Sequence, residues 1–396
     1  MSGPAGIFRP AVRLRGSRAA KSAAMRLLTS AARDEPPAEA RVVADLRETN
    51  LVAVMPLAAY HRAGGLLREF LLPRVGPDHP LVAALEAGYA VATRDHLRVL
   101  WELDQIKRVL DGAGARWAVV KGPVLVERLY RSPGSRPYLD LDVLVDPAMF
   151  PIVLDALEAA GATLIDRNWA VLRKELRGEL HLVLPGGTPL DLHWNVVNMY
   201  RRRIAFETAE VLDRVQEMQL GGIAVPGLAP TDALLHLAVH AGLSGGDRLI
   251  WAKDIERSIS CDDLDWDALV ERARRWRVGR VVGFMLRRSQ AVLGARVPPA
   301  ARRALVDPAT ERLIGIVDRL APWEHSLGRL ANPNVMLARS IGHGSRGGLS
   351  WIAQRSVRNL DPRSARLESA LTPRGGAADR AAFLEGVRAQ GRRRRK

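Results

Sequence analysis

The chain has 396 residues, of which 47% are hydrophobic, so it is long and apolar enough to build more than one packed core. Its single cysteine, Cys261, excludes an intrachain disulfide and a cysteine-ligated zinc cluster, and it favours a reducing, cytoplasmic location. No apolar run reaches the roughly 18 residues of a membrane span, so we expect a soluble protein without a membrane partner. The composition does not indicate an oligomeric state.

The formal net charge of +16 is concentrated toward the two ends of the chain. Seven basic residues precede the first acid, Asp34, and the chain closes with the run GRRRRK at 391–396. Basic ends of this kind are typical of solvated tails. We therefore expect a disordered basic segment over 1–38 and a loose Gly/Pro/Arg-rich basic tail over 326–396. Binding of RNA, DNA or an anionic surface is the alternative for these ends.

Residues 39–116 carry apolar side chains at intervals of three and four, which is the spacing of amphipathic helices. The pattern is clearest in LVAALEAGYAVATRDHLRVLWELDQIKRVLDGAG, residues 81–114. Gly112 and Gly114 at its end supply a helix stop. We expect a helical N-terminal region over 39–116.

The pattern changes at Trp117 to short strands separated by turns. The strand WAVVK is followed by the turn Gly122-Pro123 and a helix, and the strand YLDLDVLV is followed by a second helix. Two further strands, ELHLVL and PLDLHW, are joined by the hairpin-like turn PGGT. The expected fold class is α+β: a small mixed-sheet core over 117–200, flanked by the N-terminal helices and by a helical C-terminal region over 201–325.

Two carboxylates share one face of the strand YLDLDVLVD, residues 138–146. Successive side chains of a strand alternate between its faces, so Asp140 and Asp142 lie on one face while apolar residues occupy the other. Adjacent carboxylates repel unless a cation or a proton lies between them. The strand LDLHW repeats the pattern with Asp191 and His193, and it could pair beside the first. Three converging carboxylates, Asp140, Asp142 and Asp191, favour a site for Mg²⁺ or Mn²⁺ that also takes phosphate oxygens of a substrate.

Lys121 and Gly122 form a candidate phosphate site between the first strand and the helix that follows it. The glycine lets a phosphate approach the backbone, the helix start offers free N–H groups, and the lysine adds positive charge. Arg136, four residues before Asp140, is a second candidate phosphate contact.

Five segments resemble the uncharacterised nucleotidyltransferase family of the polymerase-beta-like superfamily. They are KGPVLVERLY, GSRPYLDLDVLV, LDLHW, LLHLAVH and RLIWAKDIERSI, and the similarity extends over about 50–290. The resemblance implies a metal-dependent nucleotidyltransferase that moves an NMP from an NTP donor, ATP among the candidates, to a hydroxyl acceptor and releases pyrophosphate. It also implies that Asp140, Asp142 and Asp191 are the metal ligands and catalytic residues, and that Gly122 lies at the donor phosphates.

The implied reaction leaves the acceptor open: a small molecule, a protein side chain or an RNA 3′ end. With a metal ion at the carboxylates, the acceptor hydroxyl is expected to attack the α-phosphorus in line. Asp191 is the candidate for accepting the hydroxyl proton.

Two other functions fit parts of the pattern. A catalytically inactive nucleotide- or RNA-binding regulatory module is favoured by Pro123, which stands where the superfamily usually has serine and offers neither a hydroxyl nor an N–H. A metal-dependent glycosyltransferase also uses a D-x-D motif, which Asp140 and Asp142 form here, although LDLHW then has no evident role.

Several polar residues near these motifs have a structural interpretation. Asp146, which precedes a proline, favours a helix N-cap. His193 either lines the pocket or hydrogen-bonds nearby. His236 and His240 have the i, i+4 spacing of a metal pair but lack the glutamate of H-E-x-x-H, so we expect a polar pair at the edge of the core. Asp254 is expected to be structural or to shape the acceptor pocket.

Overall fold

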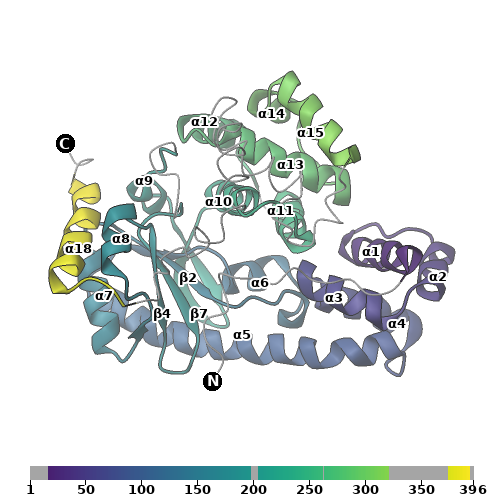
Figure 1. The fold of residues 1–396 in the computed structure, drawn as a ribbon, viewed down its shortest axis with the longest axis horizontal. Coiled ribbons are helices and arrows are strands. Elements are labelled where there is room, and N and C mark those ends of the chain that lie inside the picture. The colour runs from purple at the N-terminus through teal and green to yellow at the C-terminus, as the bar shows by residue number, and fades with distance from the viewer. Residues whose placement is uncertain (1–16, 198–203, 262, 321–372, 393–396) are drawn as a thin grey trace.

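The computed structural model describes residues 17–197, 204–261, 263–320 and 373–392. A seven-stranded sheet with its own helices lies at one end of the molecule and the N-terminal helices lie at the other, joined by one long helix (Figure 1). Within the described ranges, no helix has the length and apolar character needed to cross a membrane.

The strands are β1 (Trp117–Val119), β2 (Leu141–Val145), β3 (Thr163–Leu164), β4 (Glu179–Val183), β5 (Pro189–His193), β6 (Gln216–Leu220) and β7 (Ile223–Gly227). Their order across the sheet is β3-β4-β5-β2-β1-β7-β6. β2 is parallel to β5 and β1 is parallel to β7, while the other neighbours are antiparallel. The predicted α+β fold with a mixed sheet is confirmed, and the two strands that carry the acidic motifs are direct neighbours.

The N-terminal helices are α1 (Arg18–Ala32), α2 (Glu39–Glu48), α3 (Leu51–His61), α4 (Gly64–Val75) and α5 (Pro80–Gly112). Helices α2 to α5 agree with the helical region expected over 39–116. α5 is 33 residues long and runs from the N-terminal helices to the sheet (Figure 1).

Helix α1 corrects the expectation of a disordered segment over 1–38. Ser17 caps the helix by accepting a hydrogen bond from the Ala20 N–H at 3.1 Å. Leu27 and Leu28 are fully buried in the core shared with α2 and α4. The basic residues lie between apolar residues that recur at helical spacing. The segment is therefore an amphipathic helix, although its charge suggested a solvated tail. Residues 1–16 of the predicted segment lie outside the described residues.

The α/β unit contains five helical segments besides α5 and the strands. They are α6 (Pro123–Leu129), the 3-10 turn η1 (Pro133–Ser135), α7 (Phe150–Ala159), α8 (Trp169–Glu175) and α9 (Thr208–Leu212). Asp146 is not the N-cap residue itself, because α7 begins at Phe150. Its Oδ1 instead accepts a hydrogen bond from the Ala148 N–H at 2.9 Å in the turn that leads into α7.

The C-terminal helices are α10 (Pro230–Leu243), α11 (Leu249–Cys261), α12 (Trp266–Arg275), α13 (Gly279–Leu293), α14 (Pro299–Leu305) and α15 (Pro308–Leu320). The region expected to be helical over 201–325 also contains the hairpin β6–β7, which is a correction. Gly221 and Gly222 both have positive φ and form its tight turn. The hairpin joins the sheet through the pair Val119↔Gly227, so the sheet extends beyond 117–200.

Helix α18 (Ala377–Arg392) corrects part of the loose tail expected over 326–396. It packs against α7 and α8, and Phe383 and Val387 on its inner face are fully buried. Residues 326–372 and 393–396 of that prediction lie outside the described residues.

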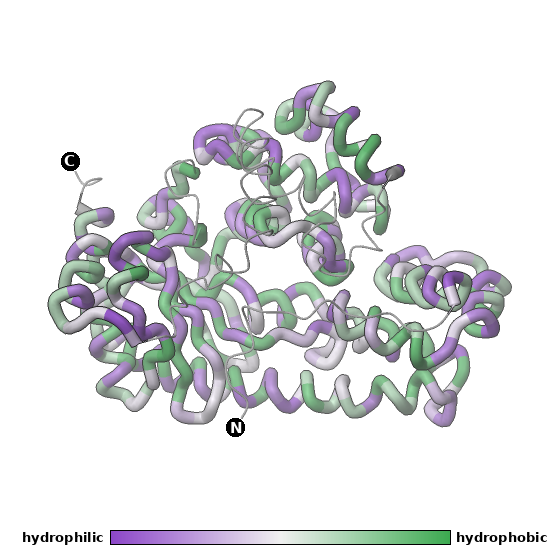
Figure 2. Tube along the Cα trace, viewed as in Figure 1, coloured by the Kyte–Doolittle hydropathy of each residue, from purple (hydrophilic) through white to green (hydrophobic). Residues whose placement is uncertain are grey.

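The sheet separates two hydrophobic cores. Leu141 and Val143 face one core, which is filled by α5, α7 and α18. Ala118 and Leu144 face the other core, which includes apolar residues of α10, α11, α13 and the N-terminal helices. Hydrophobic residues accordingly recur along every group of elements rather than in one segment (Figure 2).

Candidate active site

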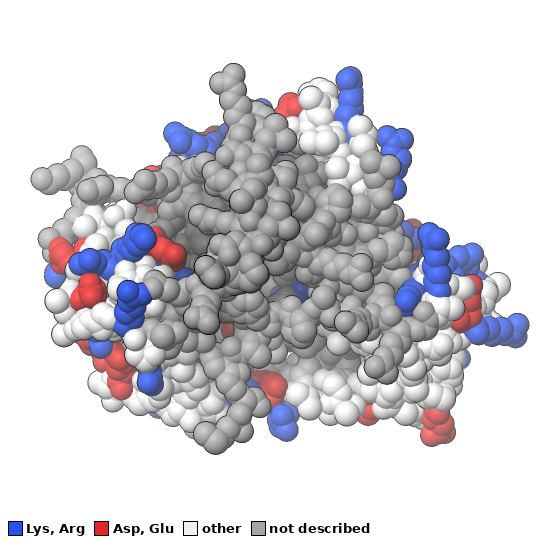
Figure 3. Space-filling view, in the orientation of Figure 1, with Lys and Arg blue, Asp and Glu red and all other residues white. Residues whose placement is uncertain are grey.

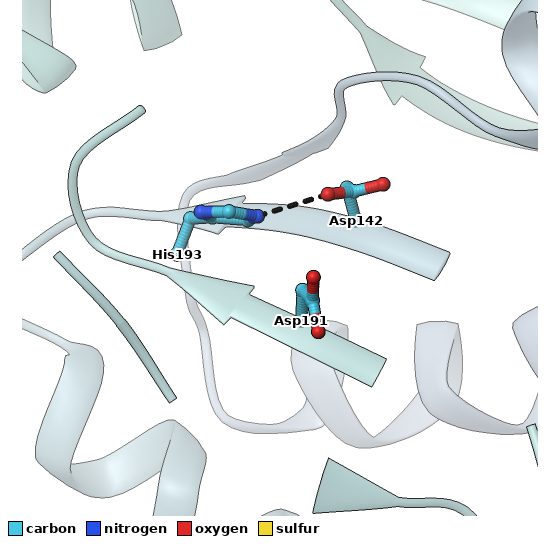
Figure 4. A group of neighbouring side chains, drawn as sticks. All are labelled: Asp142, Asp191 and His193. Carbon is cyan, nitrogen blue, oxygen red and sulfur yellow. Dashed lines mark hydrogen bonds and ion pairs between the residues drawn. The ribbon is translucent and has the colours of Figure 1, made fainter. Parts of the chain in front are cut away.

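Asp142 and Asp191 lie side by side because β2 and β5 pair in parallel with these two residues in register. The alternate residues of both strands enter the core beneath the sheet, so the acidic residues lie on the opposite face. Asp142 is fully buried, and Asp191 is partly exposed. Figure 4 shows the two carboxylates and the ring of His193 close together on the two neighbouring strands. The alternation read from the sequence therefore brings two of its three carboxylates into contact range.

Asp142, Asp191 and His193 each offer one ligand atom, and these atoms lie within 4.8 Å of one another. His193 Nε2 is 3.0 Å from Asp142 Oδ1. Among the described residues, this is the one group of three or more metal-ligating side chains. Asp140 lies one residue before β2, half-buried, and is not a member of the group.

Lys121 and Gly122 lie beside these carboxylates. Lys121 Nζ forms an ion pair with Asp142 Oδ1. Burial opposes its charge, but Asp142, Asp140 and Asp191 together raise the pKa of Lys121 above its ordinary value. Gly122 has φ +67°, and a Cβ at this position would lie 3.1 Å from the backbone oxygen of Asp140. The turn is thus restricted to glycine and fits closely against the strand of the D-x-D motif.

The two neighbouring carboxylates have pKa values shifted in opposite directions. Burial raises the pKa of Asp142, but the charges of Lys121 and His193 outweigh it and lower the pKa well below the ordinary value. Burial, followed by the negative charge of Asp142, raises the pKa of Asp191 to about 7. The ionised form is therefore favoured more strongly at Asp142 than at Asp191.

Strand β4 adds two polar residues that the sequence analysis did not assign to the site. Glu179 is directly opposite His193 in the β4–β5 ladder, and His181 is opposite Asp191. Glu179 Oε2 lies 3.2 Å from His193 Nδ1, and His181 Nε2 lies 3.8 Å from Asp191 Oδ1. The signal was present in the sequence, since ELH in β4 has the same alternation as DLH in β5.

Asp166 holds the ring of His181 through the ring nitrogen that does not approach Asp191. Its Oδ2 accepts the His181 backbone N–H at 2.9 Å and lies 2.8 Å from His181 Nδ1. Burial opposes the charged ring, but the hydrogen bond to Asp166 raises the pKa of His181 to about 10. The imidazolium therefore contributes a positive charge beside Asp191.

Arg136 lies in a different environment from the one predicted. Its Nε and Nη2 donate to the two carboxylate oxygens of Asp254 at 2.9 and 2.8 Å, and both side chains are buried. The Tyr130 hydroxyl donates to the same carboxylate at 2.7 Å. Asp254 therefore has the structural role, and the guanidinium edge of Arg136 is already occupied by a carboxylate instead of facing a phosphate.

His236 and His240 lie on α10, close enough to the site to sense its charges. Burial, followed by the positive charge of Lys121, lowers the pKa of His236 to about 3. The same two causes lower the pKa of His240 well below its ordinary value. Both rings are therefore neutral at physiological pH, and their centroids are 6.2 Å apart. Neither ring belongs to a metal-ligating group within the part of the chain that the structure describes.

A family of uncharacterised nucleotidyltransferases has a model that matches residues 48–294. The chain belongs to this family. The match begins at the end of α2 and extends through the whole sheet to α13, so it includes Lys121, Gly122 and every member of the carboxylate–histidine group. Membership in the nucleotidyltransferase family supports nucleotidyl transfer as the general role. No curated protein matches the chain, and no solved structure matches it.

Proposed function

We propose that the protein is a metal-dependent nucleotidyltransferase that transfers an NMP from an NTP to a hydroxyl acceptor and releases pyrophosphate. The observation that carries the proposal is the in-register pair Asp142↔Asp191 on parallel strands. Lys121 forms an ion pair with the Asp142 carboxylate of this pair. Buried like charges are costly, so their placement together favours a role in binding a cation.

The residues present fit a divalent cation such as Mg²⁺ or Mn²⁺. Asp142 is fully buried, and its Oδ2 has no hydrogen-bond partner among the described residues, so one carboxylate oxygen remains available as a ligand. Asp142 and Asp191 would hold the ion, and Asp140, one residue before β2, would complete the carboxylate set. When bound, such an ion neutralises these carboxylates and polarises the phosphate oxygens of the nucleotide.

Lys121 and Gly122 are proposed to hold the donor phosphates. The lysine remains charged at neutral pH because three carboxylates raise its pKa. The glycine has no side chain to block a phosphate from the backbone of the turn. Arg136 is left out of this role because the Nε–Nη2 edge of its guanidinium is paired with the buried carboxylate of Asp254.

Asp191 is proposed to accept the proton of the acceptor hydroxyl. Its carboxylate is partly exposed and lies beside Asp142, where the reacting hydroxyl would be held. As the proton moves to Asp191, the acceptor oxygen forms a bond to the α-phosphorus, and the bond from that phosphorus to the bridging oxygen breaks with loss of pyrophosphate. The acceptor itself is a small molecule, a protein side chain or an RNA 3′ end.

The test is transfer of label from each of the four NTPs, radiolabelled at the α-phosphate, with Mg²⁺ or Mn²⁺ and a cell extract as the acceptor pool. Wild type is compared with Asp142→Asn and Asp191→Asn. Asp267→Asn, at an exposed position in the first turn of α12, is the matched control. We expect label transfer with wild type and the control and none with the two site variants.

A folded wild type that binds nucleotide in equilibrium dialysis but transfers no label would replace this proposal with a nucleotide-binding regulatory module. Pro123 is the residue that favours that alternative, since it is the first residue of α6 and cannot donate a backbone hydrogen bond there. Label transfer that survives both site variants would show that the carboxylates are not the reaction centre.

A further inference from the structure

We propose that His193 is a further protein ligand of the metal site, positioned by Glu179, and that the site therefore binds Mn²⁺ in preference to Mg²⁺. The inference rests on the proposed function only in placing a divalent ion at Asp142 and Asp191. It adds an imidazole nitrogen to a site that the sequence predicts to contain oxygen ligands alone.

The ring of His193 is held at the carboxylates. It lies on β5, two residues after Asp191, so both side chains are on the same face of the sheet. Its side chain is 8% exposed, and Nε2 is 3.0 Å from Asp142 Oδ1. A cation that is close to both carboxylates is therefore also within reach of this nitrogen, because the three ligand atoms lie within 4.8 Å of one another.

Glu179 supplies the support that a ligating histidine needs. An imidazole binds a metal through Nε2 only when its remaining proton is on Nδ1, and a carboxylate next to Nδ1 stabilises that tautomer. Glu179 Oε2 is 3.2 Å from His193 Nδ1, an ion-pair distance that lacks the alignment of a hydrogen bond in this structure. The register of the β4–β5 ladder places the two residues directly opposite each other, which keeps the carboxylate close to this nitrogen.

The oxygen and nitrogen ligands together decide which ion is preferred. Mg²⁺ prefers an octahedron of oxygen ligands and gives up its water reluctantly. Mn²⁺ accepts carboxylate, water and phosphate oxygens as Mg²⁺ does, but as a transition-metal ion it tolerates an imidazole nitrogen among its ligands better than Mg²⁺ does. Asp142 contributes its unpartnered Oδ2, and Asp142 Oδ1 is already approached by two positively charged or proton-bearing groups, Lys121 Nζ and His193 Nε2. A cation in this position takes over the neutralising role that those groups now have.

The test measures metal binding to the full chain without nucleotide. Mn²⁺ is titrated by electron paramagnetic resonance, Mg²⁺ by calorimetry, and bound Mn²⁺ is examined by electron spin-echo envelope modulation, which detects a directly ligated nitrogen. For wild type we expect a lower Kd for Mn²⁺ than for Mg²⁺, with nitrogen modulation from the bound Mn²⁺. His193→Asn is expected to lose both the modulation and the preference.

Two further variants make the measurement decisive. Glu179→Gln leaves the imidazole in place, so we expect nitrogen modulation to persist while Mn²⁺ affinity falls by about 10- to 100-fold. His79→Asn is the matched control, since His79 caps α5 far along the chain and asparagine is a good helix cap. It is expected to leave both quantities unchanged.

Equal wild-type affinities for the two ions, or nitrogen modulation that persists in His193→Asn, would overturn the inference. If His193→Asn does not fold, unchanged Mn²⁺ affinity in Glu179→Gln would overturn it instead. Nitrogen-ligated Mn²⁺ in a protein that transfers no label would uphold the ligand assignment and refute the proposed nucleotidyl transfer. Label transfer in a protein without nitrogen modulation would uphold the proposed nucleotidyl transfer and refute the assignment of His193 as a ligand.

Discussion

Asp142 and Asp191 are neighbours on parallel strands, yet only one of them is stabilised as an anion. Lys121 and His193 both approach the Asp142 carboxylate, and their positive charges lower its pKa despite burial. For Asp191, burial and the charge of Asp142 outweigh the positive charge of His181, and its pKa rises to about 7. The two carboxylates of one strand pair thus differ in their affinity for a proton because their neighbouring charges differ.

Individual site residues could be predicted from the sequence where the signal is local. Asp142 and Asp191 follow from strand alternation alone. Glu179 and His181 show the same alternation, but their contact with β5 depends on the register of a hairpin, which alternation does not give. The partner of Arg136, Asp254, could not be predicted from the sequence, because it lies 118 residues away on α11 and only the tertiary fold brings the two together.

His61 is predicted to make the stability of the protein fall in mild acid. It is fully buried on α3, and its Nδ1 accepts the Leu249 N–H at 3.2 Å. Burial lowers the pKa of His61 from 6.5 to about 3. The folded chain therefore resists a proton that the unfolded chain takes up below pH 6.5, so stability present above that pH is lost as the pH falls.

Between pH 7 and pH 5 this one residue should lower the free energy of unfolding by about 2 kcal/mol. Urea denaturation at the two pH values should show a loss that is smaller by this amount in His61→Gln. His79→Asn, half-buried at the start of α5, should retain the wild-type loss. Identical pH dependence in wild type and His61→Gln would mean that the ring is protonated in the folded chain.

At the scale of elements, α11 is fastened to the loop before β2 by a buried polar cluster. Arg136 and Tyr130 come from either side of η1, and both donate to Asp254 on α11. Arg257, one turn further along α11, lies over the Tyr130 ring and donates to the Leu129 carbonyl oxygen. The cluster thereby fixes the C-terminal helices relative to the segment that leads into the D-x-D motif.

Asp254→Ala is predicted to destabilise the protein by about 3–5 kcal/mol, because it leaves the guanidinium of Arg136 buried without its carboxylate. Urea denaturation provides the measurement. The double variant Arg136→Leu/Asp254→Leu removes both charges, so it should lose less stability than the single variant. A double variant at least as unstable as Asp254→Ala would show that the pair contributes more than the mutual compensation of two buried charges.

Helix α1 and the hairpin β6–β7 were not predicted from the sequence, because charge in the first and short strands in the second obscure the apolar pattern. In α1, Arg26 and its basic neighbours suggested a solvated tail, although Ala24, Leu27 and Leu28 follow a helical spacing. The hairpin β6–β7 has strands of five residues with no long apolar run, and its register to β1 depends on a single parallel pair. By contrast, β2 and β5 were predictable because each alternates cleanly between the acidic site and a buried core.

At the scale of the molecule, the described basic residues that are visible in Figure 3 lie in separate groups. Lys and Arg side chains are interspersed there with Asp and Glu side chains in the described residues. Arg26 of α1 is an example, since it pairs with Asp45 at 2.7 Å and with Glu48 at 2.6 Å. Lys253 likewise pairs with Asp34 and Glu256, each at 2.6 Å.

The packing of α18 on the α/β unit predicts that a residue near the C-terminus stabilises the fold. Phe383 is fully buried, its ring centroid is 5.9 Å from that of Trp169, and Arg380 pairs with Glu158 at 2.5 Å. Phe383→Ala should lower the free energy of unfolding by about 3–5 kcal/mol. Urea denaturation followed by tryptophan fluorescence measures the loss. The exposed Arg388→Ala on the same helix is the control, and equal stability of both variants would refute the packing.

Helix α5 contributes buried residues to both hydrophobic cores and sets the distance between them. Its 33 residues extend for about 50 Å; Leu81 and Leu85 near one end enter the core of the N-terminal helices, and Leu103 and Leu110 near the other enter the core beneath the sheet. One residue inserted in α5 between these two pairs of leucines would rotate one pair about the helix axis by about 100° and shift it along the axis by about 1.5 Å relative to the other pair. Both the length and the phase of this helix are therefore fixed, and chains with this architecture should vary in length at their loops instead.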